Sequence, residues 1–284
     1  METIISSKTK SVVIGPECRF VIIGERINPT GRKRLAHSLA QGDMSIVRKE
    51  ALAQAEAGAQ VIDINVAAPE IDEERALPLA ARTVADSVDL PLCIDTTHEG
   101  ALAATLAVCP GKPLVNSVTG EDRSLKSALP LVKEYGAAVI GLCMDDEGIH
   151  HEAQRRLSIA EKIVNQAEKI GLHKEEVIID PLSLTVGADN RAAIVTLRAI
   201  ALIVQNLGVN TIVGASNVSF GLPDRPLINR TFLAMAIAIG LTCAIADPLD
   251  VEIRKAVATS DLLMGRDEYA MRFLAHSRAG WKEG

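Results

Sequence analysis

The chain has 284 residues, of which 48% are apolar, 23% charged and 2% aromatic. This length suits one large domain, and the apolar share is too high for a disordered chain. A formal net charge of −6 and a scarcity of aromatic side chains for stacking on bases argue against a nucleic-acid-binding protein. The composition therefore favours a folded domain whose partners are not nucleic acids.

The cysteines and the apolar runs disfavour two further classes. The five cysteines are widely spaced and form no Cys-x-x-Cys pair, which argues against a disulfide framework and a structural zinc site. The N-terminal residues lack the apolar core of a signal peptide. The longest apolar run, 232–246, is broken by Gly240 and too short to span a bilayer. We therefore expect a cytoplasmic, reduced protein that holds no metal and does not cross a membrane.

Short β-branched segments alternate with longer amphipathic segments along the chain. Eight strands are expected, at 20–24, 61–65, 92–95, 114–116, 138–142, 177–180, 211–214 and 243–246. The helices expected between them include 45–57, 73–88, 124–135, 157–170 and 192–206. This alternation predicts an α/β fold whose parallel sheet closes into a (β/α)8 TIM barrel. An open doubly wound sheet gives much of the same pattern, but no Gly-x-Gly-x-x-Gly motif for a dinucleotide follows the first strand.

No low-complexity linker divides the chain, so we expect a single domain. Residues 1–19 are expected to lead into the barrel, residues 20–263 to form it, and residues 264–284 to form a closing helix and tail. The pattern of that closing helix begins at Ser260 and continues toward Gly284.

Nearly every expected strand ends on an acidic or amide residue. In a barrel of this type the chemistry lies at the carboxyl ends of the strands, and those ends carry Asp63, Asn65, Asp95, Asn116, Asp180 and Asp247. Asp and Asn also end strands and cap helices in any α/β protein, which is sufficient to explain Asp247. A whole ring of carboxylates and amides suits a neutral heterocycle with N–H donors and ring acceptors. A phosphate site would instead need glycine loops and cations.

Other polar residues have ordinary structural explanations. Glu25 and Arg26 are interpreted as an ion pair that fixes the first loop, with a ligand contact as the alternative. His98 is expected to begin a helix, and the His150–His151 pair lacks a convincing third metal ligand. Three cysteines in or beside strands are expected to be buried apolar residues: Cys93, Cys143 and Cys243.

Five strings occur in order along the chain: GERIN at 24–28, IDTTH at 94–98, VNSVTGE at 115–121, IIDPLSL at 178–184, and a long string, GASNVSFGLPDRP to ADPLD, at 214–250. Together they resemble the pterin-binding methyltransferase family. The similarity is strongest to the methyltetrahydrofolate:corrinoid-protein methyltransferases. The pterin-binding module of cobalamin-dependent methionine synthase and dihydropteroate synthase are more distant relatives.

The resemblance implies a barrel that holds the pterin ring of a folate at its carboxyl end. It assigns pterin hydrogen bonds to Asp95, Asn116 and Asp180, and it places the catalytic amide of Asn217 at N5, the atom that carries the methyl group. Further folate contacts are implied for Gly214, Ser216 and Arg225, and secondary contacts for Asp63, Asn65 and Met144. Phe220 departs from the family, because a polar glutamine is expected three residues after Asn217.

The implied reaction moves a methyl group between N5 of (methyl)tetrahydrofolate and the cobalt of a corrinoid protein, in either direction. A neutral donor such as the Asn217 amide can stabilise N5 as the C–N bond breaks, and the proton is expected to come from solvent. The string DTTHEG at 95–100 has the wrong spacing for an Asp-x-His-x-x-Gly corrinoid loop, so the corrinoid is expected on a partner protein.

Two alternatives stay open. A dihydropteroate synthase-like enzyme is disfavoured because GASNVSFG lacks the lysine of that family. A non-catalytic folate-binding subunit would share the same pterin site. The family resemblance also implies a homodimer.

Overall fold

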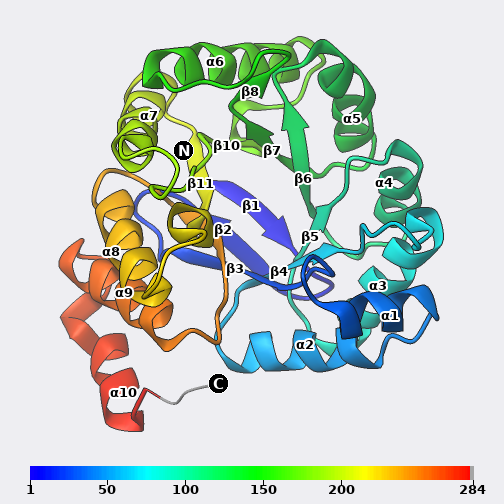
Figure 1. The fold of residues 1–284 in the computed structure, drawn as a ribbon, viewed down its shortest axis with the longest axis horizontal. Helices are drawn as coiled ribbons and strands as arrows, with labels where there is room; N and C mark the ends of the chain where they lie inside the picture. The colour runs from blue at the N-terminus through cyan, green and yellow to red at the C-terminus, as the bar shows by residue number, and fades with distance from the viewer. Residues whose placement is uncertain (282–284) are drawn as a thin grey trace.

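Eight parallel strands form a closed ring in the computed structural model, which describes residues 1–281 (Figure 1). Neighbours pair in chain order, and the last strand pairs with the first. The strands are β3 (Val21–Ile27), β4 (Val61–Asn65), β5 (Leu92–Asp95), β6 (Leu114–Thr119), β7 (Ala138–Leu142), β10 (Val177–Asp180), β11 (Asn210–Gly214) and β12 (Cys243–Ala246). The predicted TIM barrel is confirmed, and the open doubly wound sheet is excluded.

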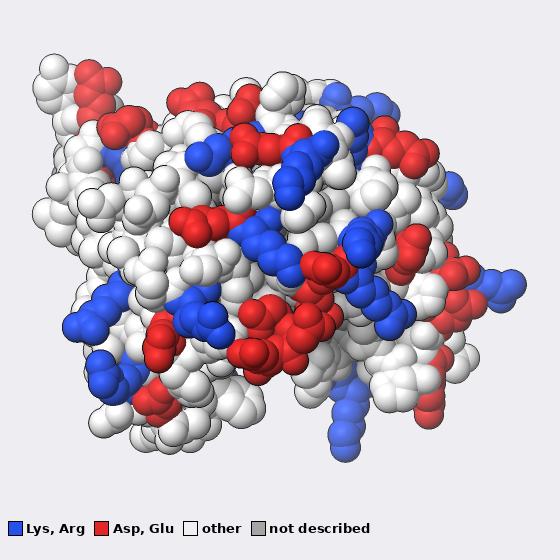
Figure 2. Space-filling view, turned by 90° about the horizontal axis from the view of Figure 1, so that it is seen from above, with Lys and Arg blue, Asp and Glu red and all other residues white. Residues whose placement is uncertain are grey.

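Helices surround the ring on its outside (Figure 1). They are α2 (Ser45–Glu56), α3 (Glu73–Ser87), α4 (Glu99–Leu106), α5 (Asp122–Glu134), α6 (Ala153–Lys169), α7 (Ala192–Leu207), α8 (Arg225–Ala238) and α9 (Val251–Leu263), with a short α1 (Lys33–Ala40) after β3. The face on the side of α5, α6 and α7 mixes acidic and basic side chains (Figure 2). Within residues 1–281, none of the helices has both the length and the apolar character that crossing a bilayer requires.

Each barrel strand alternates between the inside of the ring and the helices. Side chains in a strand point to opposite faces in turn, so one set of apolar residues fills the barrel and another packs beneath the helices. The inner set is Val21, Ile23, Val61, Cys93, Leu114, Ala138, Ile140, Ile178, Ile212 and Cys243. Outward neighbours such as Ile62, Ile94 and Ile179 belong to the layer under the helices. The barrel is a packed core rather than a pore.

The amino-terminal end of the barrel is covered by a hairpin of β1 (Thr3–Ser6) and β2 (Ser11–Ile14), which crosses the ring in Figure 1. Ile5 and Ile14 are fully buried and join the inner barrel cluster. The side-chain amide of Asn210, at the start of β11, donates to the Ile14 carbonyl at 2.9 Å. The segment expected as a lead-in therefore contributes to the core.

The carboxyl-terminal segment was expected to form one helix from Ser260, and the structure shows two helices instead. α9 ends at Leu263, and α10 (Met271–Ala279) follows a turn and the short 3-10 segment Glu268–Ala270. The backbone breaks at Gly265, whose φ of +74° favours glycine. The Asp267 carboxylate then accepts the backbone N–H groups of Arg272 and Phe273 in the first turn of α10. The end of the expected tail, residues 282–284, lies outside the described residues.

The hairpin offers a matched pair of substitutions. Ile5 is fully buried, whereas the preceding residue, Ile4, is 49% exposed. We expect Ile5→Ala to lower the free energy of unfolding by about 2–5 kcal/mol, because it leaves a cavity beneath the barrel. Ile4→Ala should change it by less than about 0.5 kcal/mol. Urea denaturation measures both variants, and equal losses would mean that the hairpin does not close the core.

Candidate functional site

A cavity of about 430 Å³ opens at the carboxyl ends of the barrel strands. We call this cavity the mouth. Seven of the residues singled out from the sequence line it: Asp63, Asp95, Asn116, Asp180, Gly214, Ser216 and Asn217. They come from β4, β5, β6, β10, β11 and the segment that follows β11, so the closed ring brings together residues that are more than 150 positions apart in the chain.

The inward direction of the acidic side chains follows from the strand period of two residues. Asp63 comes two residues after Val61, which is part of the inner apolar set, and Asp180 comes two residues after Ile178 in the same way. Each carboxyl group therefore lies directly above a packed apolar layer. Strand register places Asp95 beside Asn116 of β6. The polar layer of the mouth is thus the continuation of the barrel core.

Amide side chains hold two of these carboxylates in place. The Asn116 amide donates to Asp63 Oδ1 at 3.2 Å, and the Asn65 amide donates to Asp95 Oδ2 at 2.9 Å. Asn65 is not among the residues that line the mouth. Its contact with Asp95 makes it an orienting residue in this structure.

Burial changes the protonation of the mouth carboxyl groups. It raises the pKa of Asp180 from 3.8 to about 7. Burial raises the pKa of Asp63 well above its usual range, with a further contribution from nearby Asp95, whose own pKa burial also raises. Burial and the neighbouring Asp247 raise the pKa of Glu25. These groups ionise at higher pH than ordinary carboxyls, so N–H donors that stabilise the charged form would bind here favourably.

The predicted Glu25–Arg26 ion pair is wrong. Arg26 pairs instead with Glu50 at 2.6 Å and with Asp247 at 2.7 Å, while Glu25 accepts a hydrogen bond from the Ser216 hydroxyl at 3.4 Å. Neighbouring strand residues point in different directions, and the pairing of β3 with β4 shifts register here. Both residues line the mouth.

Several residues of the mouth were not predicted as ligand contacts, although a ligand contact was the alternative interpretation of Glu25 and Arg26. Besides Glu25 and Arg26, the additional lining residues are Asn28, Thr30, Arg32, Ile245 and Asp247. Asp247 was interpreted as turn chemistry alone, and its Oδ1 does accept the Leu249 N–H. Its position at a strand end was the signal for a ligand contact, and turn chemistry alone did not account for it.

The segment after β11 carries Asn217 on a short 3-10 helix, Ala215–Ser219. The Asn217 side chain is exposed at the rim of the mouth. A Cβ atom added at Gly214 would lie 2.8 Å from Asn217 Nδ2. A side chain at 214 would therefore displace the Asn217 amide from its present position.

Arg225 and Phe220 lie outside the walls of the mouth. Arg225 donates to the Ser216 carbonyl at 2.9 Å and to the Ser219 hydroxyl at 3.1 Å, so it fixes the segment that carries Asn217. The Phe220 ring is 69% exposed, with the Arg225 guanidinium 6.0 Å from its centroid. In this structure Arg225 stabilises the segment that carries Asn217.

The remaining candidates do not line the mouth. Met144 begins a small hairpin of β8 (Met144–Asp145) and β9 (Gly148–Ile149) and does not line the cavity. His98 caps α4 by accepting the Ala101 N–H at 3.2 Å, which confirms its predicted place at a helix start. The burial expected for three cysteines is also confirmed: Cys93, Cys143 and Cys243.

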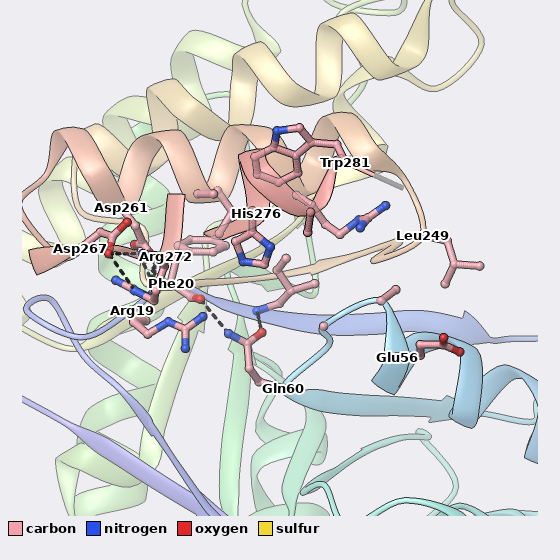
Figure 3. A pocket seen from close by; sticks show the side chains of 18 of the residues that line it. Arg19, Phe20, Glu56, Gln60, Leu249, Asp261, Asp267, Arg272, His276 and Trp281 are labelled. Carbon is pink, nitrogen blue, oxygen red and sulfur yellow. Dashed lines mark hydrogen bonds and ion pairs between the residues drawn. The ribbon is translucent and has the colours of Figure 1, made fainter. Parts of the chain in front are cut away.

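A second cavity, of about 620 Å³, lies on the flank of the barrel between α2, α9 and α10 (Figure 3). Several of its polar side chains already have partners within the protein. Gln60 bridges the backbone of β3 and the residue before it, and Arg272 pairs with Asp261 and Asp267. The strand ends do not reach this cavity, so the mouth is the candidate site.

Known proteins resemble this chain over most of its length. Residues 24–247 match the family model described as pterin binding enzyme. The chain belongs to the pterin-binding enzyme family. It is 30% identical over 270 residues to the methylcorrinoid:tetrahydrofolate methyltransferase of Eubacterium limosum, covering 92% of this chain and 97% of that protein. It is 31% identical over 257 residues to methionine synthase of Mycobacterium tuberculosis, covering 86% of this chain and 22% of that protein.

Solved structures share the fold of this pterin-binding enzyme. Dihydropteroate synthase of Yersinia pestis superposes with a TM-score of 0.70 at 15% identity, over 93% of this chain and all of that one. The enzyme of Xanthomonas albilineans in complex with 7,8-dihydropteroate gives a TM-score of 0.65 at 18% identity, over 88% and 95%. The family match and the two relatives of at least 30% identity confirm the predicted family resemblance and the prediction of an enzyme.

The raised pKa of Asp180 predicts a pH-dependent cost to the fold of this pterin-binding enzyme. Between pH 3.8 and about 7 the folded protein keeps a proton that the unfolded chain releases, so the free energy of unfolding falls as pH rises. Asp180→Asn cannot ionise. We expect it to be more stable than the parent at pH 8, by at most roughly 4 kcal/mol at about 1.4 kcal/mol per pH unit, and to lose this advantage near pH 4.

Urea denaturation at both pH values measures the effect. Asp189→Asn is the control, because a hydrogen bond from the Arg191 N–H lowers the pKa of that exposed carboxyl, so its stabilising effect is present at pH 8 and is lost in acid. If Asp180→Asn were no more stable than the parent at pH 8, burial would not be imposing this cost.

Proposed function

We propose that this chain transfers a methyl group between N5 of (methyl)tetrahydrofolate and the cobalt of a corrinoid carried by a partner protein. The observation that carries the proposal is the layer of buried carboxyl and amide groups in the mouth, with the Asn217 amide exposed at its rim. The similarity to the Eubacterium limosum methyltransferase over nearly the whole of both chains supports it.

The mouth fits a pterin ring by the chemistry of its donors and acceptors. A pterin presents N–H groups and ring acceptors on one edge, and ionised Asp180 and Asp95 can accept from such N–H groups. Among residues 1–281, the one hydrogen bond to the Asp180 carboxyl comes from the Leu182 N–H at 2.7 Å, which leaves acceptor capacity for a ligand. Asn116 supplies both an acceptor and a donor.

Asn217 acts on the reacting nitrogen. As the methyl group leaves, N5 must be stabilised by a donor or a proton, and only an interaction that strengthens in the transition state accelerates the step. The Asn217 amide is neutral, so it can hydrogen-bond N5 in both the methylated and the free folate. The same contact serves both directions of transfer, and solvent supplies the proton through the open mouth.

The cobalt of the corrinoid is the atom that gives or receives the methyl group. This chain contributes the folate site and the open rim on which the partner docks. A homodimer stays a prediction from the family resemblance. The dihydropteroate synthase alternative is weaker, because those structures are under 20% identical and share the fold alone.

The defining experiment mixes the protein with tetrahydrofolate and methylcobalamin as a free stand-in for the corrinoid partner. We expect the methylcobalamin spectrum to be lost as methyltetrahydrofolate forms. Calorimetry with tetrahydrofolate alone measures binding. Tight binding without methyl transfer, whether from methylcobalamin or from a methylated corrinoid protein, would support the non-catalytic subunit. A separate assay with an activated dihydropterin and 4-aminobenzoic acid tests the other enzyme class, which formation of dihydropteroate would support.

Asn217→Ala tests the role of the amide. We expect methyl transfer to fall by about 10²–10³-fold, the effect of removing one preorganised donor, while tetrahydrofolate binds within a few-fold of the parent affinity. Single-turnover rates and calorimetry measure the two quantities. Parental transfer rates would remove Asn217 from the reaction.

Gly214→Ala tests whether that amide must be free of crowding. The added methyl would press on Asn217 Nδ2 from 2.8 Å, so we expect transfer to fall by about tenfold or more, a loss of roughly 1.4 kcal/mol in the barrier. If the effect passes through Asn217, the double variant Gly214→Ala/Asn217→Ala should be no slower than Asn217→Ala. Additive losses would show a separate role for Gly214.

A further inference from the structure

Arg156, on α6, is fully buried although it carries a permanent charge. It does not line the mouth, and neither the strand-end pattern nor the family resemblance points to it. Burying an arginine is costly unless its charge and N–H groups are compensated. What surrounds the guanidinium therefore indicates why it is there.

The guanidinium is held by neutral oxygen atoms. Nε donates to the His150 carbonyl at 2.8 Å, and one terminal nitrogen donates to the carbonyls of Pro181 at 2.9 Å and Leu182 at 2.7 Å and to the Thr196 hydroxyl at 3.2 Å. Pro181 and Leu182 are the two residues that follow Asp180 at the end of β10. Arg156 therefore ties α6 to the turn beside the mouth.

This turn presents the Asp180 carboxyl group. Leu182 has φ of +66°, a conformation that a non-glycine residue adopts at a cost. Its N–H donates to Asp180 Oδ1 at 2.7 Å. The Leu182 carbonyl is held by both Arg156 and Thr196. The contacts of Arg156 thus maintain the turn that aims Asp180.

Arg156 is the cation whose charge acts on the Asp180 carboxyl group. Arg156 lowers the pKa of Asp180, opposing the larger effect of burial. The Cys143 and Cys243 thiols lie near it, and burial raises the pKa of each, so they are neutral. From α7 the contact is the uncharged Thr196, and Asp189 pairs with His151. The other carboxyls of the mouth, on the strands around it, are Glu25, Asp63, Asp95 and Asp247.

We propose that Arg156 is the positioning residue for Asp180: it fixes the turn that aims the carboxylate into the mouth, and its buried charge favours the ionised carboxylate that accepts N–H donors from the ligand. This inference rests on the proposed folate site for its role in binding. The effect on Asp180 itself is a property of the free protein and is measured without a ligand.

The test is a titration of the Asp180 carboxyl by ¹³C NMR in protein labelled at aspartate, with the signal assigned through Asp180→Asn. In Arg156→Gln we expect the midpoint of Asp180 to rise by about one pH unit, a tenfold change in its ionisation equilibrium. Arg156→Lys retains the charge, so its midpoint should stay within about half a unit of the parent. An unmoved midpoint in Arg156→Gln would overturn the electrostatic role.

Tetrahydrofolate binding by calorimetry, from pH 6 to pH 9, provides the second readout. Arg156→Gln should bind about tenfold more weakly at pH 7 and recover part of that loss as pH rises. Arg156→Lys lacks the planar fork that holds two carbonyls, so it should bind more weakly at every pH. Thr196→Val removes a hydrogen bond from the turn and keeps the charge of Arg156. It should therefore also bind tetrahydrofolate more weakly at every pH, while the titration midpoint of Asp180 stays unchanged.

The Lys variant keeps the proposal testable if Arg156→Gln does not fold. Parental affinity in Arg156→Lys, or a midpoint displaced by a full unit in it, overturns the proposal. Absence of tetrahydrofolate binding by the parent would contradict the proposed function instead, because the NMR titration of Asp180 would still report whether Arg156 acts on it.

Discussion

The structure depends on one geometric constraint: in a closed barrel, side chains that alternate along each strand must fill the inside. The positions that supply Val61, Cys93 and Ile178 to the apolar core are followed two residues later by Asp63, Asp95 and Asp180. The site therefore inherits the rigidity of the core. It also inherits the core's low polarity, since burial is the largest cause of the raised carboxyl pKa values. The buried carboxyl groups that can bind a ligand are therefore also groups that lower the stability of the fold.

Outside the layer of buried carboxyl groups, apolar packing and paired charges stabilise the fold. The N-terminal hairpin closes the other end of the barrel with apolar side chains, so one end of the ring is stabilised by packing while the other carries the polar layer. Cations near the mouth are already paired. Arg26 and Arg32 both contact Glu50, and Arg26 also contacts Asp247. Positive charge is thus neutralised at the rim, which suits an uncharged heterocycle better than a phosphate.

The eight barrel strands were predictable because each is a short β-branched run, buried on both faces and bounded by turn residues. The hairpin was not, because strands of four residues with one inward isoleucine, such as Ile5, leave no measurable period. Strand ends and the family resemblance together identified half of the residues that line the mouth. The same reasoning failed at Glu25 and Arg26, where a register shift between β3 and β4 decides which way each side chain points. Asp247 shows that a turn-forming residue can also line a ligand cavity.

Arg156 marks a different limit of sequence reasoning. Its burial is visible only in the tertiary structure. α6 begins at Ala153, four residues before the apolar pattern that starts at Leu157. This additional polar turn places Arg156 in the interior. A charged residue just ahead of an apolar helix ordinarily faces solvent. Here it meets the carbonyls that follow Asp180. Burial drives the Asp180 carboxyl group toward its neutral form, so it needs a nearby cation if it is to be ionised and accept hydrogen bonds near pH 7. A cation in direct contact with this carboxylate inside the mouth would compete with the ligand for it. Placing it behind the turn satisfies both requirements.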